Sequence, residues 1–379
     1  MMTDGVGPLQ PRFPDVRRIA VLRAGGLGDL LFAVPAVQSL IAAYPDAEIT
    51  LLGTRAAQEL LSGRPGTPDR VVVLPAVRGV GALPDADVDA AHITRFLAER
   101  QSEGIDLAVQ LHGGGRFSNP FLLAMNPRHT IGTRTSDAAE LERSIDYVYY
   151  QHEVLRALEV VGLAGASPVA LEPSLKVTQQ EREAARAEIG GEEPVVVMHP
   201  GATDPRRRWP LERFADVARR LVRDGVRVVL VGGGGDADLS RRLADVVRDG
   251  LDPGAADLVV DTAGRLALPV LAGVLAEADV VLANDSGPRH LAHAVGSRTV
   301  SIYWFGNVVN AGPLGRGRHR IHLSWTTHCP VCGRDSTQAG WTAQRCAHDV
   351  SFVADVAVSP VYEDVIRLLD DSVRSRTPN

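Results

Sequence analysis

The sequence predicts an α/β protein of two doubly wound domains, each built around a parallel sheet. Short apolar runs rich in β-branched residues alternate with helical stretches, and the alternation starts again at Pro194. Two successive βαβ series imply two domains, and 379 residues suit that number. The predicted strands are Ile19–Leu22, Ile49–Leu52, Val71–Leu74, Leu107–Leu111, Val195–His199, Val226–Val231, Leu258–Val260, Val280–Ala283 and Thr299–Trp304.

The same pattern predicts the domain boundaries. Residues 1–16 are rich in Pro and Gly and predict a flexible leader, 17–176 form an N-terminal domain, and the polar stretch 177–193 forms a linker. A C-terminal domain spans 194–358, and 359–379 hold a closing helix and a tail that we expect to be disordered after Asp371. The predicted helices include Val34–Ala43, Ala91–Glu103, Gln179–Glu188, Leu211–Arg223 and Val361–Leu369.

Charge and hydropathy argue against two classes of protein. A net charge of −6 does not suit a nucleic-acid binder, which usually carries a basic excess. No apolar run approaches the roughly 18 residues that a transmembrane helix needs, and the N-terminus lacks a signal-peptide pattern. We therefore expect a cytoplasmic protein without a transmembrane segment. A cytoplasmic location does not preclude a substrate that is anchored in the membrane.

The first candidate site is the loop Arg23–Asp29, Arg-Ala-Gly-Gly-Leu-Gly-Asp, directly after the first predicted strand. Its glycines, Gly28 among them, allow a tight turn and close approach of the backbone to a ligand. A NAD-binding loop is the alternative, but the spacing is not G-x-G-x-x-G and no acidic residue ends the second strand. Asp29 is either a reactive carboxylate or only a helix cap.

Two further glycine-containing segments follow strands of the second domain. His199–Pro210 contains Thr203 and the three arginines 206–208, and a basic cluster at the end of a strand suits phosphate binding. The alternative is a solvated surface, with Trp209 as a packing anchor. After the next strand, four glycines precede Asp236, which either accepts hydrogen bonds from ribose hydroxyls or caps the following helix.

The segment Ala283–His290, Ala-Asn-Asp-Ser-Gly-Pro-Arg-His, is the most specific motif. Ser286 and Gly287 place a hydroxyl and backbone amides at a helix N-terminus, where the dipole and unpaired N–H groups attract a diphosphate. His290 lies four residues after Ser286 and therefore on the same side of the helix. The alternative makes Asp285 or Ser286 a plain cap and His290 a core residue.

Together, and in this order, these motifs resemble glycosyltransferase family 9, the ADP-heptose:lipopolysaccharide heptosyltransferases. The resemblance implies a GT-B fold of two facing Rossmann-like domains, with the acceptor in the N-terminal domain and an ADP-sugar in the C-terminal one. It also implies inverting transfer of a sugar, a heptose in this family, to a hydroxyl of a glycolipid or glycoside, without a catalytic metal. Asp29 matches the general base, and Arg207 stands where the family usually has a lysine that contacts the donor phosphates.

The resemblance also implies binding residues. The expected donor contacts are Gly28, Thr203, Asp236, Asp285, Ser286, Gly287, Pro288 and His290, and Arg116 and Arg134 are candidates for an anionic acceptor. The segment Tyr303–Asn310 departs from the family's usual Gly-Pro-Thr-Asp-Pro ending, so the donor sugar stays open. A GT-B epimerase, a nucleotide-sugar-binding paralogue without catalysis and a NAD-dependent oxidoreductase are the competing interpretations.

All three cysteines fall in the segment 328–348. Cys329 and Cys332 form a C-x-x-C knuckle, and Cys346 and His348 complete four ligands of the kind that a structural Zn²⁺ site uses. A permanent disulfide does not suit a cytoplasmic protein. Zinc binding, reduced structural cysteines and a redox pair are the three alternatives.

Overall fold

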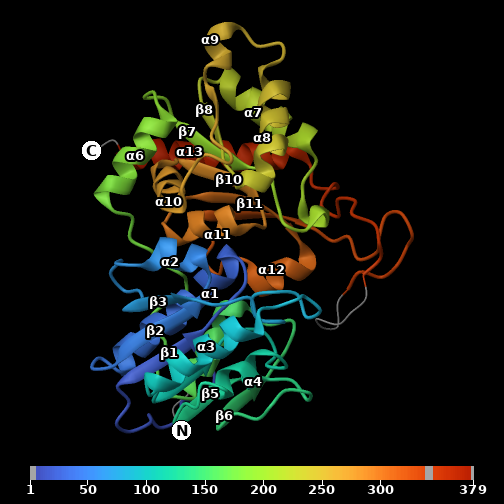
Figure 1. The fold of residues 1–379 in the computed structure, drawn as a ribbon. Helices are drawn as coiled ribbons and strands as arrows, with labels where there is room; N and C mark the ends of the chain where they lie inside the picture. The colour runs from blue at the N-terminus through green and yellow to red at the C-terminus, as the bar shows by residue number, and fades with distance from the viewer. Residues whose placement is uncertain (1–5, 338–344, 377–379) are drawn as a thin grey trace. The chain divides into compact units, whose positions relative to one another are not determined.

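The computed structural model describes residues 6–337 and 345–376, and the chain divides into two compact units between Leu175 and Lys176 (Figure 1). Each unit has a six-stranded sheet in which all paired strands run parallel, so the predicted α/β class is confirmed. No helix within the described ranges is long and apolar enough to cross a membrane.

The first unit has the strand order β3-β2-β1-β4-β5-β6. Helix α1 packs against α5, while Phe96 of α3 and Phe121 of α4 share an apolar cluster with residues of β1 and β4. The elements are β1 (Arg18–Leu22), α1 (Leu27–Ala43), β2 (Glu48–Gly53), α2 (Arg55–Leu61), β3 (Arg70–Val73), α3 (Ala90–Ser102), β4 (Leu107–Gln110), α4 (Ser118–Leu123), β5 (His129–Arg134), β6 (Arg143–Asp146) and α5 (Glu153–Gly162).

The second unit has the order β12-β11-β10-β7-β8-β9. Its elements are α6 (Gln179–Ile189), β7 (Val195–His199), the 3₁₀ turn η1 (Pro205–Arg207), α7 (Leu211–Arg223), β8 (Arg227–Leu230), η2 (Gly234–Asp236), α8 (Ala237–Arg248), α9 (Pro253–Ala256), β9 (Val259–Asp261), α10 (Leu268–Glu277), β10 (Val280–Asn284), α11 (Gly287–Ala294), β11 (Thr299–Trp304), α12 (Phe305–Ala311), β12 (His319–Ser324) and α13 (Val358–Arg376).

Both sheets follow one topological scheme. Counted within its own unit, each has the order 3-2-1-4-5-6, so the winding direction reverses between the first and fourth strands. The loops that leave these two strands diverge at their carboxyl ends and open a crevice where ligands bind in such folds. The switch point lies between β1 and β4 in the first unit and between β7 and β10 in the second. The glycine-containing motifs follow β1, β7 and β10.

The described parts of the predicted flexible leader and tail differ from that prediction, and residues 1–5 of the leader lie outside the described ranges. Phe13 is buried, stacks on His129 with ring centroids 4.2 Å apart, and lies 3.8 Å below the guanidinium of Arg143. Residues 6–16 therefore pack on the first unit instead of forming a leader. The tail prediction was also wrong in part, because α13 continues past Asp371 to Arg376; residues 377–379 lie outside the described ranges.

The predicted linker contains α6, which packs against α10 of the second unit. Arg182 and Arg186 donate to the two carboxylate oxygens of Glu277 at 2.6 and 2.8 Å. Burial raises the pKa of Glu277, but these hydrogen bonds outweigh it and the net pKa is lowered. The helices approach so closely that a Cβ added at Gly273 would lie 2.3 Å from the backbone oxygen of Glu181.

We expect Gly273→Ala to lower the melting temperature by several degrees. The added methyl has to push α6 away from α10, and overpacking of this kind costs about 1–3 kcal/mol, although alanine is otherwise the better helix residue. Scanning calorimetry checks this against Gly254→Ala in α9, where the nearest atom is 3.6 Å away. An unchanged melting temperature for Gly273→Ala would contradict close packing of α6.

Candidate active site

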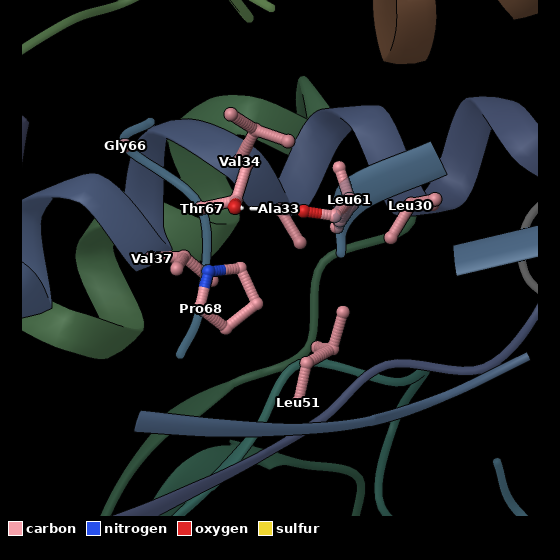
Figure 2. Close-up of a pocket in the computed structure, with 9 residues that line it drawn as sticks. All are labelled: Leu30, Ala33, Val34, Val37, Leu51, Leu61, Gly66, Thr67 and Pro68. Carbon is pink, nitrogen blue, oxygen red and sulfur yellow. Dashed lines mark hydrogen bonds between the residues drawn. The ribbon is translucent and has the colours of Figure 1, made fainter. Parts of the chain in front are cut away.

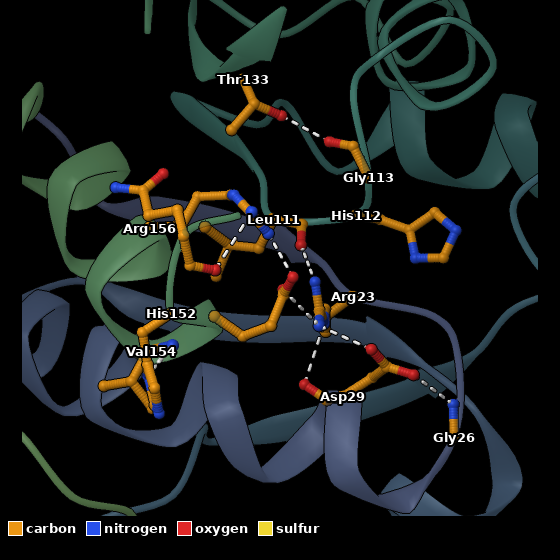
Figure 3. Close-up of polar contacts among 12 residues, drawn as sticks. Arg23, Gly26, Asp29, Leu111, His112, Gly113, Thr133, His152, Val154 and Arg156 are labelled. Carbon is orange, nitrogen blue, oxygen red and sulfur yellow. Dashed lines mark hydrogen bonds and ion pairs between the residues drawn. The ribbon is translucent and has the colours of Figure 1, made fainter. Parts of the chain in front are cut away.

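The carboxylate of Asp29 lies at the switch point of the first unit (Figure 3). Its Oδ1 accepts from Arg23 at 2.8 Å, and its Oδ2 accepts the N–H of Gly26 at 2.9 Å, which caps the start of α1. Gly25 has φ of +101°, and a Cβ there would lie 2.5 Å from Oδ2. The loop therefore needs glycine at this position to let the carboxylate fold back over it.

Arg23 pairs with Asp29 and also has other hydrogen-bonding partners. The arginine side chain is 7% exposed, and its Nη2 also pairs with Glu153 at 3.2 Å, while Nη1 donates to the carbonyl of Leu111 after β4. One buried cation is thus shared by two carboxylates. The Asp29 side chain remains 46% exposed, so it is oriented yet open to a ligand.

A histidine from the end of β4 stands beside this pair. Burial lowers the pKa of His112, the nearby charge of Arg23 lowers it further, and Asp29 opposes the effect. The imidazole is therefore neutral at pH 7, and its Nε2 lies 3.3 Å from the carbonyl of Gly79. Sequence reasoning did not identify Arg23, which lies in the same loop, as the partner of Asp29. It also missed Glu153 and His112, because their proximity to Asp29 depends on a helix and a strand far apart in the chain.

The second switch point is built on Asn284 at the end of β10. Its side-chain oxygen accepts the N–H of Trp209, and its Nδ2 donates to the carbonyl of Pro200 at 2.8 Å. Trp209 is buried and donates its indole N–H to Val356, so the packing interpretation of this residue is correct. These bonds fix the loop after β7 against the loop after β10.

Asp285 follows Asn284 and is 1% exposed. Its carboxylate accepts from Arg207 of η1 at 2.9 Å, from Asn307 of α12 at 2.9 Å and from His290 of α11 at 3.0 Å. Burial alone would raise the pKa of Asp285, but the hydrogen bond from His290 and the charge and hydrogen bond of Arg207 outweigh it, so the pKa lies well below its usual range. The residue is a buried, permanently charged anchor.

His290 is held as a neutral ring. Arg289, which can only donate, lies 3.2 Å from its Nδ1, so that nitrogen accepts and Nε2–H is left to donate to Asp285. Burial lowers the pKa of His290 against the opposing charge of Asp285, in agreement with this tautomer. The interpretation of His290 as a packed residue is thus partly correct, because its ring orients Asp285.

Ser286 occupies the position before α11, but its side chain makes no hydrogen bond to the first turn of the helix. Its Oγ instead lies 2.9 Å from Nδ1 of His199, whose Nε2 lies 3.3 Å from Oδ2 of Asp236. The plain-cap interpretation of Ser286 is therefore wrong. Gly287 and Pro288 form the first turn of α11, and Thr203 is exposed on the loop before η1.

The two candidate acceptor arginines each have an acidic neighbour. Arg116 lies 3.5 Å from Asp137, and Arg134 lies 2.7 Å from Glu140, on the loop between β5 and β6. Exposed pairs of this kind contribute little to stability and exchange readily with a ligand anion. Their role as acceptor contacts stays a prediction.

The cysteine cluster assembles as the spacing predicts. One ligand atom from each of Cys329, Cys332, Cys346 and His348 lies within 4.8 Å of the others, and the three thiols are not paired as disulfides. Hydrogen bonding from the Cys332 amide is the main cause that lowers the pKa of the Cys329 thiol to about 6. Three sulfurs and one imidazole in a small cluster fit a tetrahedral zinc ion. Residues 338–344 of this segment lie outside the described ranges.

The cavity drawn in Figure 2 is unrelated to these groups. It lies between α1, β2 and the loop 66–68 and has room for about 10 Å³. Its lining is apolar apart from Thr67, whose hydroxyl donates to Leu61 and Arg64. A small-molecule site usually offers about 300 Å³ or more, so this cavity is a packing gap in the first unit.

Comparison with known proteins identifies the family. Residues 101–339 match the model of glycosyltransferase family 9 (heptosyltransferase). Lipopolysaccharide heptosyltransferase 2 of Salmonella typhimurium is 24% identical over 93% of this chain and 99% of its own length.

Two solved structures share the fold. ADP-heptose lipopolysaccharide heptosyltransferase II of Escherichia coli superposes with a TM-score of 0.70 at 18% identity, covering 94% of this chain and all of that one. A family 9 glycosyltransferase of Veillonella parvula gives 0.72 at 18% identity, covering 95% and 98%. The fold is therefore the GT-B fold of two Rossmann-like domains, and this chain belongs to glycosyltransferase family 9.

Proposed function

We propose that this enzyme is an inverting glycosyltransferase that moves a heptose from an ADP-sugar to a hydroxyl of a glycolipid or glycoside acceptor. The observation that supports it most is the group at the second switch point, where Arg207 and the start of α11 surround the Asp285–Ser286 turn. Its relatives include lipopolysaccharide heptosyltransferases, which favours a heptose as the transferred sugar and a lipopolysaccharide-type acceptor.

The donor diphosphate binds between η1 and α11 in this proposal. Gly287 begins α11, so its amide and those of the first turn offer N–H groups and the positive end of the helix dipole. Arg207 uses Nη1 for Asp285 and keeps further N–H groups for phosphate oxygens. These groups stabilise the charge that grows on the leaving ADP, and no catalytic metal is required.

Asp29 is the general base. Inversion at the anomeric carbon needs the acceptor hydroxyl on one face and the departing diphosphate on the other, so the base and the diphosphate site have to come from opposite sides. Arg23 and the Gly26 amide orient the carboxylate, while its exposure leaves lone pairs for the hydroxyl proton.

The acceptor and location follow from the same chemistry. A nucleotide-sugar donor is a cytoplasmic substrate, and a glycolipid acceptor places the reaction at the inner face of a membrane, which the enzyme would reach by peripheral contact. Arg116 and Arg134 would release their acidic neighbours to meet an anionic acceptor.

A donor panel tests the proposed substrate class. We expect ADP-heptose to raise the melting temperature more than UDP-, GDP- or dTDP-sugars, which carry another base, and more than NAD, which carries nicotinamide riboside in place of the heptose. Slow hydrolysis of the same donor, followed by ADP release, should show the same ranking. Preferential stabilisation by NAD would indicate an oxidoreductase, and conversion of the sugar without ADP release would indicate an epimerase.

A further prediction concerns the general base. Asp29→Asn should lower kcat about 10²- to 10⁴-fold, the usual contribution of a general base, while the Kd for ADP changes less than about threefold. Asp46→Asn, on an exposed aspartate whose partner Arg17 is 3.5 Å away, is the matched control and should keep wild-type rates. A near-wild-type rate for Asp29→Asn would remove Asp29 from the mechanism.

Another prediction concerns the cysteine cluster, which we assign to a structural Zn²⁺. Protein purified without chelator should contain close to one zinc per chain by mass spectrometry, and chelation should lower its melting temperature. Cys332→Ser should lose the metal, whereas His328→Ala, whose ring contacts Thr327 instead of the cluster, should retain it. Less than a tenth of a metal ion per chain would reject the site.

A further inference from the structure

Three side chains from three segments that are separate in the sequence form a continuous series of hydrogen bonds in the second unit. Asp236 precedes α8, His199 ends β7 and Ser286 precedes α11. The imidazole joins the other two, with Nε2 3.3 Å from the carboxylate and Nδ1 2.9 Å from the hydroxyl. His199 is 3% exposed and Ser286 is 7% exposed, so water does not compete freely for these bonds.

Two glycines leave the space that the hydrogen-bonded side chains of Asp236, His199 and Ser286 need. A Cβ at Gly201 would lie 2.2 Å from Oδ1 of Asp236 and 2.9 Å from Nε2 of His199, and a Cβ at Gly232 would lie 2.7 Å from the Cβ of Asp236. Neither glycine has a positive φ. Their role is therefore to admit the carboxylate beside the imidazole, which is an observation independent of the hydrogen bonds.

The direction of these bonds depends on the number of protons on the ring. A neutral imidazole beside a carboxylate carries its proton on Nε2, so Nδ1 accepts and the Ser286 hydroxyl donates to it. The hydroxyl then turns only lone pairs toward a ligand. A doubly protonated ring donates from Nδ1 to Ser286, and the hydroxyl proton becomes available to another acceptor.

A diphosphate carries only acceptor oxygens near neutral pH, so it binds the second arrangement and is repelled by the first. We propose that His199 is a positioning residue for the donor diphosphate, which takes up a proton when the nucleotide binds and thereby turns the Ser286 hydroxyl into a hydrogen-bond donor to phosphate. This inference rests on the proposed donor class. Asp236 then serves mainly as the counter-charge of the imidazolium.

Other charges lie around the ring. Asp236 faces Nε2, and the charge of Arg208 helps to lower the pKa of that carboxyl, after the larger effect of the His199 hydrogen bond. Asp285 is next to Ser286 in the sequence, and its carboxylate is already paired with Arg207 and hydrogen-bonded by the Nε2–H of His290. Asp236 is thus the carboxylate that the imidazolium contacts directly.

Calorimetric titration with ADP-ribose tests the proposal, because its two phosphates have no group that titrates near neutral pH. The binding enthalpy is measured between pH 6 and 9 in buffers of low and high ionisation enthalpy, and the difference gives the number of protons exchanged on binding. The wild-type protein should take up a fraction of a proton when ADP-ribose binds. Affinity should be highest at low pH and fall as pH rises, by at most about tenfold per pH unit for one linked proton.

Two variants separate this role from a merely structural one. His199→Asn keeps a polar group beside Ser286 but cannot be protonated, so binding should persist with no proton uptake and with less than about a threefold change in affinity across the range, as one linked proton has been removed. Ser286→Ala should also reduce the uptake, because the hydroxyl no longer couples the ring to the phosphate. The control His319→Asn, on a buried histidine bonded to Thr299, should behave as wild type.

Proton uptake that is absent from wild type at every pH, or that survives in His199→Asn, would overturn the inference and leave the proposed function intact. Failure of ADP-ribose and of every nucleotide sugar to bind the wild-type protein would overturn both.

Discussion

The buried carboxylate of Asp285 is the interaction on which the rest of the second unit's site depends. A charge that is 1% exposed is tolerated only when it is paired and hydrogen-bonded. Its three donors come from η1, α11 and α12, the segments that follow β7, β10 and β11. One carboxylate thus contacts three neighbouring segments at the carboxyl edge of the sheet. Their positions relative to one another are fixed by the hydrogen bonds that each donates to Asp285.

The first unit has the same strand order, but the carboxylate at its switch point differs from Asp285 in its exposure to solvent. The partner of Asp29 is buried, while Asp29 itself is 46% exposed, and Arg23 is divided between Asp29 and Glu153. A buried anion such as Asp285 keeps its charge and serves as an anchor. An exposed one held on two sides has a fixed direction and a solvent-exposed edge, as the proposed proton abstraction requires.

The sequence predicted the nine apolar strands because buried parallel strands are uninterrupted hydrophobic runs; Thr299–Trp304 agrees with β11 at both ends. It missed β5, β6 and β12, because polar and charged side chains interrupt the apolar residues of His129–Arg134, Arg143–Asp146 and His319–Ser324.

The sequence also located the motifs at the two switch points, because glycine and helix-start patterns are local. It did not identify Glu153 or His199 as partners of the motif residues, since those contacts arise only when segments far apart in the chain are placed side by side.

The arginine at position 207 has a physical reason once its contacts are known. The side chain has to hold Asp285 permanently and still meet the donor phosphates in the proposed reaction. A lysine ammonium is a compact point charge whose three donors radiate from one atom, so a bond to Asp285 draws the whole charge toward that carboxylate. The planar guanidinium of Arg207 separates the tasks: Nη1 stays with Asp285, and other N–H groups of the same fork lie at a different edge. With 23% of the side chain exposed, that edge is available without breaking the anchor. The exchange of lysine for arginine in this position therefore preserves the charge and lets the buried pair persist through the binding of a second anion.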